Sequence, residues 1–140
     1  MANYPIPTKR LEQIATDVCH SVFDGVEAYD HPKTAQWNEA IIQKTLKALL
    51  SEAPTTNNNA PAYKFAINST VVQHVVPTSQ LNKPAGSTDA ADVKKQAGRR
   101  GMHSATGGYW NEKTDGMWSF KYDGEAQGLD VVIMVIWIAI

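Results

Sequence analysis

The chain ends in the apolar stretch "VVIMVIWIAI", residues 131–140, which contains no charged residue, proline or glycine. As a helix, these ten residues would rise only about 15 Å, roughly half the hydrocarbon core of a bilayer. Seven of the ten are Val or Ile, which lose rotamer freedom in a helix but pack well in a sheet. We therefore predict a buried strand here and expect no membrane insertion.

Both faces of this strand are apolar, because hydrophobic residues occupy its odd and even positions alike. An antiparallel sheet commonly keeps one face in water, and helices from the same chain would cover only the other. The second face is therefore expected to pack against another copy of the chain, sheet to sheet about a twofold axis. Met134 and Ile136 are expected to lie in this dimer interface.

Helical spacing of apolar residues predicts two amphipathic helices, over residues 8–26 and 31–53. We expect the first to have Thr8 as its N-cap and to end near Gly25, and the second to carry Pro32 in its first turn. Their apolar faces are expected to consist of Leu11, Ile14, Val18, Val22 and Val26 in the first helix and Trp37, Ile41, Leu46 and Leu49 in the second.

The hydrophobic period changes after the polar loop at residues 54–61, and alternation predicts strands over residues 62–76 and 117–122. "DGEAQG", residues 123–128, predicts a hairpin that joins the second of these to the C-terminal strand. With a further strand over residues 101–110, the prediction is a single α+β domain, residues 1–140, in which two N-terminal helices pack on a four-stranded antiparallel sheet. Residues 77–98 offer little apolar surface and are predicted to be a flexible insertion between the first and second strands.

Composition and motifs argue against an enzyme. The formal net charge is −1, so no nucleic-acid partner is expected. The sequence contains no phosphate-binding loop, no H-E-x-x-H and no C-x-x-C, and its four histidines lack metal-ligand spacing, so we expect no catalytic residue, no cofactor and no metal. The one cysteine, Cys19, and the absence of an apolar leader predict a cytoplasmic location.

"GMHSATGGYW", residues 101–110, is the candidate binding segment. Its middle is small and uncharged, glycines in a strand often mark the close approach of another backbone, and an uncharged sheet edge is normally paired. Two interpretations remain open. The segment pairs with an extended peptide by strand addition, or it is an interior strand with a glycine bulge.

Three stretches together resemble the Tctex-type cytoplasmic dynein light chains. They are "AYDHPKTAQWNEAIIQKTLKALL" (residues 28–50), "YKFAINSTVVQ" (63–73) and "GMHSATGGYWNEKTDGMWSFKYDG" (101–124), followed by the apolar C-terminal strand. They contain the family's Ala-Tyr-x-His pattern, its Gly-x-His-x-Ala strand and its Thr-Asp-Gly turn. The resemblance covers about residues 12–74 and 99–140.

This resemblance implies a homodimer in which the second strand swaps onto the partner's sheet. It also implies a non-catalytic light chain of the cytoplasmic dynein motor, located in the cytoplasm and on the cytoskeleton, that binds the dynein intermediate chain and links the motor to cargo proteins during microtubule transport. An alternative with the same fold remains open: a dimeric adaptor or hub that binds extended peptides independently of dynein.

The resemblance also implies the residues involved. The peptide-binding residues are Met102, His103, Ser104, Ala105, Thr106, Gly107, Gly108 and Tyr109 on the swapped strand, with Trp37 and Lys44 of the second helix as the other wall. The dimer interface is expected to include Gly101, His103, Ala105, Tyr109, Met134 and Ile136.

The insertion is the one departure from the family pattern, because members usually join the first two strands by a short connection. We expect deletion of residues 77–98 to leave the dimer intact, since a longer hinge only eases the crossing of the next strand. Analytical ultracentrifugation of the shortened chain measures this. A monomeric product would give the insertion a structural role.

Overall fold

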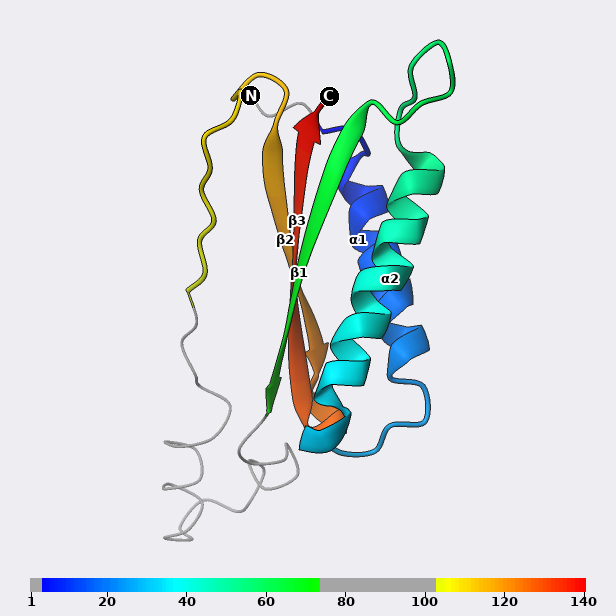
Figure 1. Ribbon diagram of the computed structural model, residues 1–140. Coiled ribbons are helices and arrows are strands. Elements are labelled where there is room, and N and C mark those ends of the chain that lie inside the picture. The colour runs from blue at the N-terminus through cyan, green and yellow to red at the C-terminus, as the bar shows by residue number, and fades with distance from the viewer. Residues whose placement is uncertain (1–3, 74–102) are drawn as a thin grey trace, which may run out of the picture.

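The computed structural model describes residues 4–73 and 103–140, which form two helices on one face of a three-stranded antiparallel sheet (Figure 1). In chain order the elements are α1 (Thr8–Val22), the short 3-10 helix η1 (His31–Lys33), α2 (Thr34–Glu52), β1 (Tyr63–Gln73), β2 (Gly116–Gly124), the 3-10 helix η2 (Glu125–Gln127) and β3 (Leu129–Ala139).

The C-terminal strand β3 lies in the middle of the sheet, in the order β1-β3-β2. It pairs antiparallel with β1 along its whole length, from Leu129 to Ala139, and with β2 from Leu129 to Trp137. The predicted strand and the predicted hairpin with β2 are therefore confirmed. No helix within the described residues is long and apolar enough to cross a membrane.

The odd-numbered residues of β3 face the helices and form the centre of the core. Val131, Ile133, Val135 and Trp137 are each at most 1% exposed. Burial contributes roughly 1.5–3 kcal/mol for each such side chain. A typical hydrogen bond contributes a net of only about 1 kcal/mol, so each of these buried side chains contributes more than a single ladder bond. The helices supply the other half of the core, with Leu11, Ile14, Val18, Trp37, Ile41 and Leu49 among its buried members.

Two details of the helices differ from the prediction. Thr8 is the first residue of α1 and not its N-cap, because Pro7 occupies the cap position and its carbonyl accepts the N–H groups of Arg10 and Leu11. In α2, Thr45 is buried and Leu46 is only partly buried. The buried residues of α2 are four positions apart, and two such steps from Trp37, through Ile41, reach position 45.

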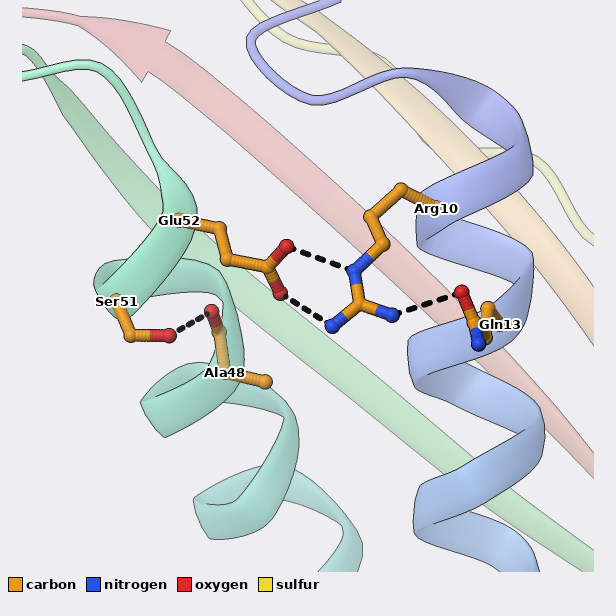
Figure 2. Close-up of polar contacts among 5 residues, drawn as sticks. All are labelled: Arg10, Gln13, Ala48, Ser51 and Glu52. Carbon is orange, nitrogen blue, oxygen red and sulfur yellow. Dashed lines mark hydrogen bonds and ion pairs between the residues drawn. The ribbon is translucent and has the colours of Figure 1, made fainter.

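The two helices are tied together at one end by an ion pair (Figure 2). Arg10 Nε and Nη2 donate to the two carboxylate oxygens of Glu52, at 2.7 and 3.0 Å, and Nη1 donates to Gln13 at 2.8 Å. This hydrogen bonding raises the pKa of Arg10 and lowers that of Glu52. Because the pair is exposed, it fixes the alignment of the helix ends more than it adds stability.

The expected fourth strand is not formed within the described part of the chain. Residues 103–110 run extended but make no ladder, on the side of the sheet opposite the helices (Figure 1). A strand needs a neighbouring edge at ladder distance, and a segment lying over the face of its own sheet does not meet one. Residues 74–102, with the predicted insertion at 77–98, lie outside the described residues.

Gly116, at the start of β2, is packed against Trp137. A Cβ placed on Gly116 would lie 2.8 Å from Cζ2 of that indole. We therefore expect Gly116→Ala to destabilise the fold by about 1–3 kcal/mol, as overpacking does. The matched control is Gly107→Ala, whose added Cβ would meet no atom within 4 Å. Urea unfolding measures both. Equal stability of the two variants would contradict the close packing of Gly116 against Trp137.

Candidate functional site

The face of the sheet opposite the helices, called here the outer face, is built on the even-numbered residues of β3. Val132, Met134 and Ile136 form its apolar centre, and Ile138 lies at its end, 42% exposed. In the sheet register, the polar residues Asn68 of β1 and Ser119 of β2 flank Met134 on either side. The apolar stripe is therefore one strand wide at Met134 and widens at Ile136, which lies between Ala66 and Met117.

Residues 103–110, called here the extended segment, lie over this stripe. The hydroxyls of Ser104 and Thr106 donate to the sulfur of Met134, at 3.3 and 3.7 Å. Met134 is consequently only 4% exposed, although no helix covers it. The alternation of an extended chain turns the intervening residues away from the sheet.

The residues of the extended segment that do not contact Met134 are open to solvent. His103, Ala105, Gly107 and Tyr109 are all exposed, Tyr109 completely. Among the described residues, the extended segment makes no backbone ladder, and β2 pairs with a strand on one side only. The chain thus has an unpaired extended segment and an open sheet edge at the same time.

The two expected walls of the binding site do not meet within one chain. Trp37 is buried, 6% exposed, with its ring against Phe23 and Tyr29 in the core. Lys44 is exposed on α2 and donates to the hydroxyl of Ser21 at 2.6 Å. Both lie in the helical layer, and the extended segment lies across the sheet from it (Figure 1).

The dimer-interface residues expected from the sequence are only partly described. Met134 lies beneath the extended segment and Ile136 is partly buried beside it on the outer face. His103, Ala105 and Tyr109 are on the exposed side of the extended segment, and Gly101 and Met102 lie outside the described residues.

The turn between the extended segment and β2 has a polar centre that sequence reasoning did not single out. The Asp115 carboxylate is 6% exposed and accepts three hydrogen bonds: from the Asn111 N–H at 2.9 Å, the Thr114 hydroxyl at 3.0 Å and the Ala139 N–H at 2.7 Å. The Thr-Asp-Gly sequence indicated a turn. Its bond to the end of β3 depends on residues 24 positions away and has no local signal.

These bonds keep the Asp115 carboxyl ionised. The main-chain N–H groups of Ala139 and then Asn111 lower its pKa below the usual value. The sign follows from the lowered pKa: the bonds stabilise the fold at neutral pH, and this contribution is lost as the pH falls through the folded-state pKa.

Groups that could support catalysis are placed unfavourably. Cys19 is completely buried in the core, and burial raises the pKa of its thiol to about 12, so the nucleophilic thiolate is scarce at neutral pH. Within residues 4–73 and 103–140, no three His, Cys, Asp or Glu side chains gather as a metal site would require.

The fold is an α+β module with an open sheet edge, and an exposed edge is where strand addition takes place in proteins that use it. The Tctex-1 family model matches residues 5–138 of this chain. A dynein light chain Tctex-type from Schizosaccharomyces pombe is 32% identical over 136 residues, which cover 97% of this chain and 97% of that protein. The chain belongs to the Tctex-1 family, as the resemblance in its sequence indicated.

Met134 is the most buried residue of the apolar stripe on the outer face, so a charge introduced there should cost the most stability. We expect Met134→Asp to destabilise the fold by about 3 kcal/mol or more, because an unpaired carboxylate would be buried. Ile138→Asp is the matched control on the same face, and at 42% exposure it should change stability by about 0.5 kcal/mol or less. Guanidinium unfolding distinguishes them. Similar losses in both variants would contradict burial of Met134.

Proposed function

We propose that this chain is a light chain of the cytoplasmic dynein motor, a non-catalytic homodimer that binds an extended segment of the dynein intermediate chain. Membership of the Tctex-1 family and a relative named as a dynein light chain support this role. The function places the protein in the cytoplasm and on the microtubule cytoskeleton, where the dimer could also connect cargo proteins to the motor.

The observation that carries the proposal is the unpaired extended segment beside an open edge of β2. In the proposed dimer, each protomer places its extended segment on the β2 edge of the other and completes a four-stranded sheet. That exchange leaves the far edge of the swapped strand free to pair with a peptide. Two such edges in one dimer make binding bivalent, which raises the effective affinity for a partner with two segments.

The extended segment suits backbone recognition. Met102 to Tyr109 would supply the main-chain donors and acceptors, and the small residues between Ser104 and Gly108 let a peptide backbone approach closely. Lys44 is exposed on α2. In the proposed dimer, Lys44 of one protomer can form the second wall beside the extended segment of the other, although the two lie on opposite sides of the sheet within one chain. Trp37 would act from within the core, by holding α2 in place.

The outer face gives the dimer its hydrophobic surface. Within residues 4–73 and 103–140, the extended segment contacts this stripe at Met134, between Val132 and Ile136. When two chains exchange these segments, the apolar stripes of both sheets would be brought together. Met134 and Ile136 would then be buried between protomers along with His103, Ala105 and Tyr109.

Calorimetric titration with intermediate-chain peptides tests the mechanism, with Thr106→Pro as the main variant. Proline removes one backbone N–H from the strand, so affinity should fall at least about tenfold. Thr106→Ala is the matched control, because it loses the hydroxyl but keeps the N–H. Its affinity should stay within about twofold of the original.

Ala105→Pro sharpens the test, since neighbouring N–H groups in a strand point to opposite edges. One of the two proline variants should lose the peptide and remain dimeric, and the other should weaken the dimer itself. If both variants are dimeric and bind the peptide with unchanged affinity, strand addition along this segment is wrong.

A further inference from the structure

The two edges of β3 end differently. On the β1 side, pairing runs to Tyr63 opposite Ala139, and the Ile140 N–H continues it by donating to the Ala62 carbonyl at 3.0 Å. On the β2 side, the last pair is Gly116 opposite Trp137. Two further pairs on the same register would place Asp115 opposite Ile138 and Thr114 opposite Ala139.

The Ala139 N–H points towards that missing position. Neighbouring N–H groups of a strand point to opposite edges, and the N–H of Ile140 is used on the β1 side. The N–H of Ala139 therefore faces β2. Its partner there is the Asp115 carboxylate, at 2.7 Å, where a longer β2 would offer a main-chain carbonyl.

The same carboxylate closes the turn that precedes β2. It accepts the Asn111 N–H, while the N–H groups of Thr114 and Asp115 donate to the Asn111 carbonyl, at 3.1 and 2.7 Å. The Asn111 side chain in turn accepts the Lys113 N–H at 3.0 Å. Residues 111–115 thus form a closed polar turn joined to the end of β3.

We propose that Asp115 is the positioning residue that ends β2 and directs the extended segment out of the plane of the sheet, so that the segment is available for exchange with a second protomer. If β2 were longer by two residues, the Thr114 carbonyl would take the Ala139 N–H and the buried carboxylate would lose one of its three donors, which is costly. The carboxylate therefore selects the short strand and the out-of-plane exit. The consequence for exchange rests on the proposed dimer.

The test compares Asp115→Ala and Asp115→Asn with Asp123→Asn. Asp123 lies near the opposite end of β2, and its carboxylate accepts a single N–H, that of Glu125, at 3.1 Å. The dissociation constant of the dimer is measured by sedimentation of the full chain, and thermal unfolding of each variant is followed in parallel. Variants are compared at a temperature where all of them are folded.

We expect Asp115→Ala to raise the dimer dissociation constant at least about tenfold and Asp123→Asn to change it by less than about threefold. Asp115→Asn should be intermediate, because its amide oxygen can still accept the Ala139 N–H while its NH₂ cannot accept the N–H of Asn111. This graded order is the readout that a merely structural role would not give. If Asp115→Ala fails to fold, the comparison of Asp115→Asn with Asp123→Asn can still be made.

Two failures are distinguishable. A wild-type chain that stays monomeric at all concentrations would overturn the proposed dimer and with it the exchange. A dimeric wild type whose Asp115→Asn variant dimerises as tightly as Asp123→Asn would overturn the role of Asp115 alone. Equal weakening by Asp115→Asn and Asp123→Asn would do the same, because it would show a general effect of charge on β2.

Discussion

The apolar character of β3 on both of its faces is the constraint on which the rest of the structure depends. From Val131 onward this strand carries no charge on either face, so it is poorly suited to a sheet edge in water; it takes the centre and pairs with β1 and β2. Its odd-numbered residues are covered by the two helices. Its even-numbered residues need a second cover, and within one chain the only described contacts to Met134 from outside the sheet come from the extended segment.

Polar contacts at both ends of the molecule join the helices to each other and to the β2-β3 hairpin. Arg10 and Glu52 join the helix ends at one end of the molecule. Near the other, the Gln127 amide at the tip of the β2-β3 hairpin donates to the carbonyls of Phe23 and Val26, at 2.7 and 3.0 Å, and so satisfies groups that follow α1. The extended segment differs from the rest in that no backbone ladder holds it.

The turn at residues 111–115 connects the extended segment to β2, and its chemistry differs from both. Asp115 is buried yet fully hydrogen bonded, so it gives direction to the chain without leaving an unsatisfied charge. Gly116 follows it because the Trp137 indole occupies the space of a side chain. Core packing and a polar turn therefore meet at one point, where the extended segment leads into β2.

The sequence by itself determined the two helices, the strands β1, β2 and β3, the β2-β3 hairpin and the family, because hydrophobic period and turn residues are local properties of the chain. Only the tertiary structure decided the rest. It placed Trp37 in the core, buried Thr45 in preference to Leu46, and left residues 103–110 without a ladder. It also joined Asp115 to Ala139. Each of these depends on which distant segment lies opposite, and neither composition nor period carries that information.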